Sequence, residues 1–291
     1  MDIFVQQVVS GLATGGIYAS LALALVMIYQ ATDVVNFAQG EMAMFSTYLA
    51  WSMLQAGLPY WVTFLATVAI AFVGGLLIER IVIRPVEDAP ILTIVIVTLG
   101  LLVILNSVAG WIYTYTIKEF PSPFPAGMAL GRFLSPHEVG AIGVTLLVLA
   151  ALYVFFRFTP LGLAMRAAAQ NPLSSRLAGI RVSWMLALGW GLAATFGAVA
   201  GIMVAPILTL DPNMMGGIQI YAFAAATLGG FGSPVGAVVG GFLVGVVENL
   251  VGTYVSFIGT ELKLTVALAM IIVVLLVKPS GLFGRTHVRR V

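Results

Sequence analysis

The chain has 291 residues, of which 61% are hydrophobic and only 8% are charged. A water-soluble domain carries about 25% charged residues, so this composition excludes a cytosolic enzyme, a nucleic-acid-binding protein and a secreted domain. The formal net charge is only +2, and the absence of cysteine excludes disulfides, thiolate metal sites and cysteine nucleophiles. Composition therefore predicts a polytopic membrane protein.

Continuous apolar runs predict how often the chain crosses the membrane. A helix needs about 20 mostly apolar residues to cross a hydrocarbon core about 30 Å thick. The runs do not alternate as the strands of a membrane barrel do, so the predicted fold class is all-α. About eight transmembrane helices are expected, some of them broken, over residues 3–29, 34–56, 60–82, 90–113, 138–157, 184–208, 219–255 and 262–277.

The basic residues predict the orientation, because Lys and Arg concentrate in cytoplasmic connections. Ten of the thirteen lie in three segments that odd numbers of crossings place on one face: Arg80, Arg84, Arg157, Arg166, Arg176, Arg181, Lys278, Arg285, Arg289 and Arg290. Connection 158–183 is therefore expected in the cytoplasm, and loop 114–137, with Lys118 and Arg132, outside the cell. The N-terminus is then outside, provided that the first two predicted helices both cross the membrane.

A polar interruption at 33–41 separates the first two apolar runs. Asn36 is followed three residues later by Gln39, which resembles a capping box and predicts a helix start. One interpretation is a short cytoplasmic turn, in which Asn36 caps the helix and Glu41 reaches headgroup water. The other is a broken helix that points its N-terminus at a substrate carboxylate, with Glu41 facing a substrate ammonium. The sequence leaves both open.

The longest cytoplasmic connection, 158–183, predicts two short helices. Its alanine-rich part, 163–170, strongly favours a helix. Asn171-Pro172 indicates a turn, and a second short helix is expected to close at Gly179, a C-cap residue. The compact pair is interpreted as a docking element for another protein. The alternative is that both helices lie on the lipid headgroups.

A second interruption, Gly229-Gly230-Phe231-Gly232-Ser233-Pro234, breaks the seventh predicted helix. After it, Gly241, Gly245 and Glu248 lie on one helix face, so Glu248 is expected to point into protein. One interpretation is tight packing through small residues, with a neighbouring donor on Glu248. The other is a transport pathway, because glycine-rich breaks in matching positions of two halves are typical of one.

Two absences limit the chemistry of the chain. None of its three lysines lies in a Gly-Lys-Ser/Thr sequence, so no ATP site and no cofactor are expected. The two histidines, His137 and His287, lie at the edge of a predicted span and in the C-terminal tail, so no histidine pair is expected in the membrane and no metal is expected. We therefore expect no catalysis, and transport would depend on an ion gradient, a concentration difference or a partner.

Several motifs together resemble one family, the branched-chain amino-acid ABC permeases. Asn36-Phe37-Ala38-Gln39-Gly40-Glu41 is similar to the family's Asn-Phe-Ala-His-Gly-Glu signature, with Gln39 in place of the usual histidine. The other similar segments are Glu79-Arg80 with Arg84-Pro85, Thr98-Leu99-Gly100 with Asn106, Arg166–Ile180, Gly229–Gly241 and Lys278–Gly284. Because of Gln39, no protonatable ring is expected at that position.

The resemblance implies a single transmembrane permease domain over residues 1–291 of a bacterial or archaeal inner (plasma) membrane protein. It implies a homologous second permease subunit, two cytoplasmic ATPase subunits that use the ATP, and an extracytoplasmic substrate-binding protein as partners. Membrane lipid would surround the chain, and no nucleic acid is expected. Leucine, isoleucine and valine are the implied cargo, although relatives carry other amino acids, amides or urea.

The candidate residues fall into three groups. Substrate-pathway candidates are Asn36, Gln39, Glu41, Asn106, Gly229, Gly230, Gly232 and Ser233. ATPase-docking candidates are Arg166, Gln170, Asn171, Arg176 and Gly179, and interior packing or polar candidates are Gly241, Gly245 and Glu248. The alternative functions are a gradient-driven secondary transporter, with Glu41 and Glu248 as an ion relay, and a passive channel for a small neutral solute such as urea.

Overall fold

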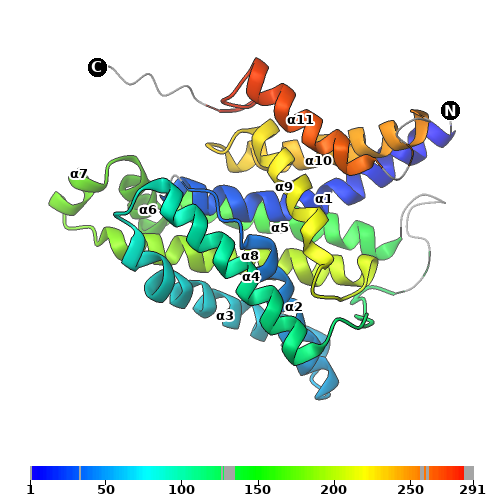
Figure 1. The fold of residues 1–291 in the computed structure, drawn as a ribbon, viewed down its shortest axis with the longest axis horizontal. Coiled ribbons are helices and arrows are strands. Elements are labelled where there is room, and N and C mark those ends of the chain that lie inside the picture. Colours follow the sequence, from blue (N-terminus) through cyan, green and yellow to red (C-terminus); the bar gives the residue numbers. More distant parts are fainter. Residues whose placement is uncertain are drawn as a thin grey trace. The chain divides into compact units, whose positions relative to one another are not determined.

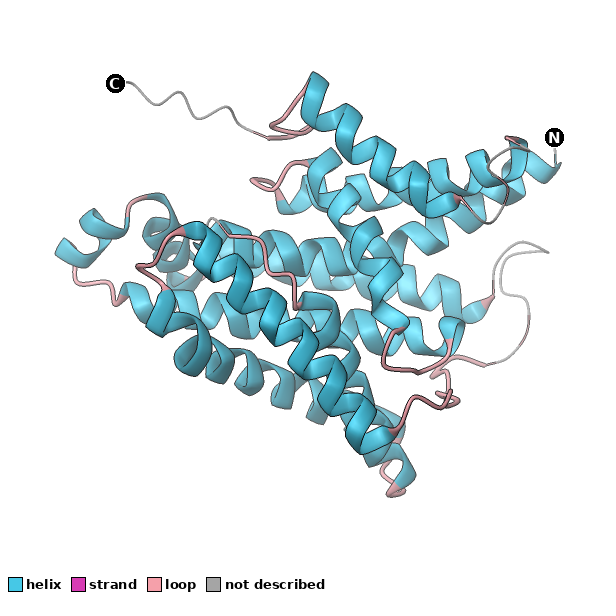
Figure 2. Ribbon diagram, viewed as in Figure 1, coloured by secondary structure: helices cyan, strands magenta, loops and turns pink. Residues whose placement is uncertain are grey.

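The computed structural model describes residues 2–32, 34–125, 127, 135–255, 259 and 262–284. Asp33, Arg132, Arg285, His287, Arg289 and Arg290, which the sequence analysis used, lie outside these residues. Within the described ranges every regular element is helical, apart from one isolated bridge between Lys118 and Leu210 (Figure 2). The predicted all-α fold is confirmed for this part of the chain.

Eleven α-helices are described, and Figure 1 labels them in chain order. They are α1 Asp2–Thr32, α2 Gln39–Gln55, α3 Tyr60–Ile78, α4 Ile91–Tyr113, α5 Pro136–Phe158, α6 Pro160–Gln170, α7 Pro172–Leu177, α8 Val182–Leu208, α9 Met214–Gly229, α10 Pro234–Tyr254 and α11 Lys263–Val277. A π turn, Glu79–Ile83, and a 3-10 turn, Arg84–Val86, continue α3.

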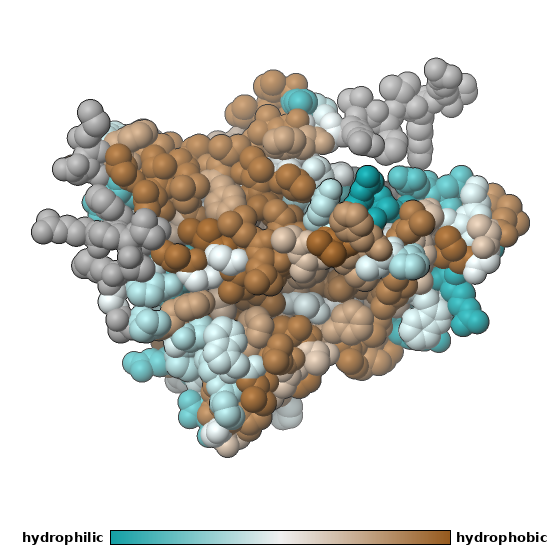
Figure 3. All heavy atoms as spheres, turned by 180° about the vertical axis from the view of Figure 1, so that it is seen from behind, coloured by the Kyte–Doolittle hydropathy of each residue, from teal (hydrophilic) through white to brown (hydrophobic). Residues whose placement is uncertain are grey.

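Six of the described helices are long and apolar enough to cross a membrane, so the predicted count of eight is not confirmed. The range 219–255, predicted as one broken span, is two helices, of which α9 has only 16 residues. Helix α11 has 15 residues and is about 23 Å long at 1.5 Å per residue, shorter than a hydrocarbon core of about 30 Å. Apolar side chains nevertheless cover much of the visible face in Figure 3, as lipid contact requires.

The contacts divide the chain into two compact units. The first comprises residues 1–26, 124–143 and 217–291, and the second 27–123 and 144–216. The expected single permease domain stays a prediction.

Small residues set the packing inside the second unit. Helices α2 and α3 both pack against α8. A Cβ on Gly75 of α3 would lie 2.5 Å from the carbonyl oxygen of Trp190, and a Cβ on Gly201 would lie 2.7 Å from that of Ala43. Helix α8 therefore meets both neighbours at backbone distance, which only small side chains permit.

In the first unit, glycines of α1 and α10 face each other. A Cβ on Gly15 would lie 2.7 Å from the Cα of Phe242, and a Cβ on Gly241 would lie 2.5 Å from the Cα of Ala19. Gly11 and Gly245 continue the same contact one turn along. These contacts agree with the packing interpretation of Gly241 and Gly245, in which the glycines let two helix backbones approach closely.

Candidate functional site

The break before α2 lies inside the second unit. Asn36 and Gln39 are fully buried, and Gln39 Nε2 donates to the carbonyl oxygen of Ala193 at 3.0 Å. Ala193 is the twelfth of the 27 residues of α8, so α2 begins beside the middle of that helix. Glu41 is only 6% exposed. This geometry favours the broken helix over a cytoplasmic turn with Glu41 in headgroup water.

The capping box predicted at this break is wrong. The N-cap of α2 is Ala38, which has no capping side chain. Asn36 Oδ1 instead accepts from the backbone N–H of Ala38 at 3.0 Å, and Asn36 Nδ2 donates to Gln39 Oε1 at 3.2 Å. Gln39 Oε1 thus accepts from the side chain of Asn36 and not from its backbone N–H, while Gln39 Nε2 donates to α8. The helix starts two residues later than a capping box would place it.

A polar cluster lies beside the first turn of α2, and it joins two of the predicted pathway residues. Asn106 Nδ2 of α4 is 3.4 Å from Glu41 Oε2, 2.8 Å from the carbonyl oxygen of Pro212 and 3.3 Å from Asn213 Oδ1. The Tyr115 hydroxyl donates to Asn106 Oδ1 at 3.3 Å. The sequence analysis missed the contributions of Tyr115, Pro212 and Asn213, because both segments lie in connections without a motif.

Aromatic side chains and backbone hydrogen bonds fix the connections after α4 and after α8, which contribute residues to this cluster. Tyr48 and Tyr113 stack with ring centroids 4.4 Å apart, and Lys118 lies 4.9 Å above the ring of Trp51. Lys118 and Leu210 exchange two backbone hydrogen bonds of 2.9 and 3.0 Å. The connection after α4 is thereby tied to the one after α8, which fixes the polar cluster in place.

The glycine-rich break in the first unit has a packing role. Ser233 caps α10, since its Oγ accepts from the backbone N–H of Gly236 at 3.0 Å. The backbone N–H groups of Leu282 and Phe283 donate to the carbonyl oxygens of Leu228 and Gly229 at 2.8 and 3.1 Å. The turn after α11 is therefore hydrogen-bonded to the glycine-rich break. A pathway role for Gly229, Gly230, Gly232 and Ser233 stays a prediction.

Glu248 is buried, as its shared face with the glycines predicted. The Tyr18 hydroxyl donates to Glu248 Oε2 at 2.7 Å, and Lys263 Nζ lies 3.9 Å from Oε1. The ring of Tyr18 stacks on that of Tyr221 with centroids 4.6 Å apart. The side chain thus joins α1, α10 and α11 within the first unit, as the packing interpretation expects.

Glu79 is a buried acidic residue to which the sequence analysis gave no role. It opens the π turn after α3, and neither carboxyl oxygen has a hydrogen-bond partner among the described residues. Its neighbour Arg80 lies 5.2 Å above the ring of Trp184. A glutamate at the end of an apolar run was the available signal, because ionisable groups at membrane depth are functional candidates.

Connection 158–183 forms two capped helices, as predicted. Thr159 caps α6 by accepting from the Gly162 N–H at 3.0 Å, and Asn171 caps α7 by accepting from the Ser174 N–H at 2.9 Å. Gly179 has φ +84° and ends the pair. Together α6 and α7 are called the elbow here. The predicted docking residues Arg166, Gln170, Asn171, Arg176 and Gly179 are all exposed on it.

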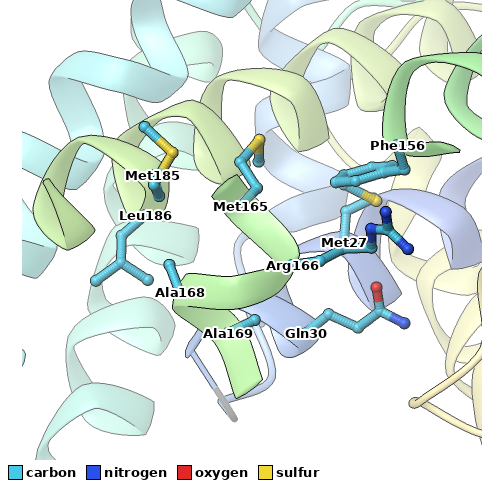
Figure 4. Close-up of a pocket in the computed structure, with 9 residues that line it drawn as sticks. All are labelled: Met27, Gln30, Phe156, Met165, Arg166, Ala168, Ala169, Met185 and Leu186. Atoms are coloured by element: carbon cyan, nitrogen blue, oxygen red, sulfur yellow. The ribbon is translucent and has the colours of Figure 1, made fainter. Parts of the chain in front are cut away.

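A small pocket of about 40 Å³ lies at the base of the elbow (Figure 4). It is lined by Met27, Gln30, Phe156, Met165, Arg166, Ala168, Ala169, Met185 and Leu186. Mostly apolar side chains from the end of α1, from α5, α6 and the start of α8 therefore meet here. Arg166 is the only charged group in the lining, which makes the base of the elbow a packed joint between helices of the second unit.

Residues 7–275 match the family model described as the permease component of the branched-chain amino acid transport system. The chain belongs to this family. It is 31% identical to the high-affinity branched-chain amino acid transport system permease protein LivH of Escherichia coli K12, over 99% of this chain and 98% of that protein. It is 30% identical to the corresponding permease protein BraD of Pseudomonas aeruginosa, with the same coverage.

More distant similarity extends the comparison. The autoinducer 2 import system permease protein LsrC of Salmonella paratyphi B is 27% identical over 84% of this chain and 71% of that protein. Among solved structures, PsaBC from Streptococcus pneumoniae in complex with Fab matches with a TM-score of 0.50 and 14% identity, over 93% of this chain and 91% of that chain. That likeness concerns the fold alone. Membership in a permease family and six apolar helices make this a multi-pass membrane protein.

Proposed function

We propose that this chain is the membrane-spanning permease subunit of an ATP-driven importer of branched-chain or other hydrophobic amino acids. The alignment with LivH and BraD over nearly the whole length of each protein supports this function. We place the subunit in the inner (plasma) membrane of a bacterium or archaeon. Its proposed partners are a homologous second permease, two cytoplasmic ATPase subunits and an extracytoplasmic binding protein.

The structure of the elbow supports the proposal that an ATPase docks on this chain and drives transport. Its two helices are independently capped, and Leu173 and Leu177 on α7 are 70% and 84% exposed beside Arg176. Two exposed leucines on a cytoplasmic element favour contact with another protein. Since the sequence contains no phosphate-binding lysine motif, ATP hydrolysis is assigned to the docked partner, and this chain needs no cofactor.

Within the permease, we assign different roles to the pathway candidates near α2. Asn36 and Gln39 bond to each other and to α8, so they hold the break in the helix. Glu41 and Asn106 lie in the polar cluster, whose member Asn213 is exposed, so they line the pathway. The family match does not favour a gradient-driven carrier or a passive channel.

Cysteine crosslinking tests the docking role directly, because the chain has no cysteine of its own. With Asn171→Cys we expect a crosslink to an ATPase subunit in the assembled importer. Ile117→Cys, exposed in the connection after α4, is the matched control and should form none. Transport in vesicles should require ATP. Failure of every exposed elbow position to crosslink, or full transport without an ATPase subunit, would overturn the proposal.

A further inference from the structure

One nitrogen atom in the second unit is surrounded by three oxygen acceptors. Asn106 Nδ2 lies 2.8 Å from the Pro212 carbonyl oxygen, 3.3 Å from Asn213 Oδ1 and 3.4 Å from Glu41 Oε2. All three oxygens are therefore within hydrogen-bond reach of the same point. The three acceptors, together with the Asn106 side chain that they surround, are called the oxygen cradle.

The cradle offers more acceptors than its own nitrogen can satisfy. A primary amide nitrogen carries two hydrogens and no charge, so it can satisfy two of the three oxygens well. The longest contact is the one to Glu41, whose carboxyl group is 6% exposed. A buried carboxylate needs hydrogen bonds or an opposite charge to offset its lost hydration, and one long amide contact supplies little of either.

A primary ammonium group has the complementary chemistry. It carries three hydrogens and one positive charge, which match three acceptors of which one is a carboxylate. Hydrogen bonds between ionised partners are roughly twice as strong as neutral ones. A metal cation fits less well, since hard cations such as Ca²⁺ take about 6 to 8 oxygen ligands.

The cradle is also accessible from one side. Glu41 forms its buried floor, whereas Asn213 is exposed and Tyr115, whose hydroxyl contacts Asn106, is 57% exposed. These rim residues belong to the connections after α4 and α8, and the first of these connections is predicted to be extracytoplasmic. A solute arriving from outside would therefore meet the rim before the carboxylate.

We propose that the oxygen cradle binds the primary ammonium group of the amino acid as it enters the permease. Glu41 supplies the charge, and Asn213 and Pro212 supply the remaining acceptors. Asn106 moves aside or shares the acceptors with the ammonium. The site thus selects for a free amino group and makes no contact that would distinguish one amino-acid side chain from another. This inference rests on the proposed import function and names the part of the substrate that the permease recognises.

The test measures protection of a rim cysteine in the importer without its binding protein, so that recognition by that partner does not interfere. Tyr115→Cys leaves all three acceptors in place and adds the only cysteine of this chain. Millimolar L-leucine should slow its alkylation about tenfold, the ratio that corresponds to roughly 1.4 kcal/mol. The 2-oxo acid with the same side chain, which lacks the ammonium, should not slow it. Ile117→Cys in the same connection is the control cysteine and should show no protection.

Glu41→Gln keeps the size of the side chain and removes its charge, so protection by leucine should disappear. Glu119→Gln removes an exposed carboxylate from the same connection and should leave protection intact. If Glu41→Gln does not assemble, Asn213→Ala removes one acceptor from the exposed rim and should also weaken protection.

Three results would overturn the inference: equal protection by the 2-oxo acid, protection by sodium chloride alone, or no protection by leucine. Each is distinguishable from failure of the proposed function, because ATP-dependent transport by the unmodified importer is measured separately. ATP-dependent transport with an unprotected cysteine would reject the cradle and retain the import function.

Discussion

Removing the hydroxyl group of Tyr18 should destabilise the first unit measurably. Tyr18→Phe keeps the ring that stacks on Tyr221 and deletes only the donor that lies 2.7 Å from Glu248 Oε2. Glu248 then keeps the Tyr221 hydroxyl as a hydrogen-bond partner and Lys263 at 3.9 Å as a partner of opposite charge. The variant therefore isolates one buried hydrogen bond between α1 and α10.

The expected loss is about 1–2 kcal/mol of unfolding free energy. A hydrogen bond to a charged group contributes about 1.5–3 kcal/mol in soluble proteins. Bonds between membrane helices average only about 0.6 kcal/mol and reach about 1.7, because the unfolded chain in the membrane also finds partners. The short distance and the burial of Glu248 place this bond near the top of the membrane range.

Denaturant titration of the detergent-solubilised protein measures the effect, with Tyr254→Phe as the control. Tyr254 is exposed, so loss of its hydroxyl should change the unfolding free energy by less than about 0.5 kcal/mol. The loss of unfolding free energy caused by Tyr18→Phe should also vanish in the background of Glu248→Leu, because the hydrogen-bond acceptor is then gone. Equal effects of Tyr18→Phe and Tyr254→Phe would refute the reasoning.

Three further predictions use matched variants. Gly241→Leu should abolish the folded protein in gel filtration, because its Cβ meets the backbone of α1, whereas Gly100→Leu, with open space around it, should be tolerated. Gly230→Ala should lower the thermal midpoint, since φ is +97° and a Cβ meets the carbonyl of Ser280; Gly232→Ala should not. Asn171→Ala should cost α7 about 1 kcal/mol of cap stabilisation and should reduce ATP-driven transport. Asn171→Asp, which keeps a capping oxygen, should restore both the stability of α7 and transport. Unchanged transport by Asn171→Ala would argue against a coupling role for the elbow.

Local sequence patterns predicted the bounds of the long helices well, but they predicted poorly which distant residues the side chains contact. The apolar runs placed α3, α4, α5 and α8 within a few residues of their observed bounds, because length and hydropathy are local properties. The capping box failed because both atoms of the Gln39 amide bond elsewhere: Oε1 accepts from the side chain of Asn36, and Nε2 donates to Ala193 of α8, 154 residues away in the sequence. No local pattern contains such a competing partner.

The candidate site shows the same division. Glu41 and Asn106 were predicted from their polarity within apolar surroundings, and the structure brings them together. Pro212 contributes a backbone oxygen, which no residue type can signal. The sequence left packing and a pathway open for the glycine-rich break, and only the structure shows that the turn after α11 hydrogen-bonds to it.

The first unit is assembled from segments that the ribosome makes far apart in time. Tyr18 and Glu248 are separated by 230 positions, and synthesis at about 5–20 residues per second therefore delays their contact by roughly 10–50 s. During that interval the glycine face of α1 has no α10 to pack against. Helix α1 must lie in the membrane with this face unpaired, and its 28-residue apolar segment Ile3–Gln30 is long enough to span it. Biogenesis of this unit thus ends only when residues 282 and 283 emerge and close the break between α9 and α10.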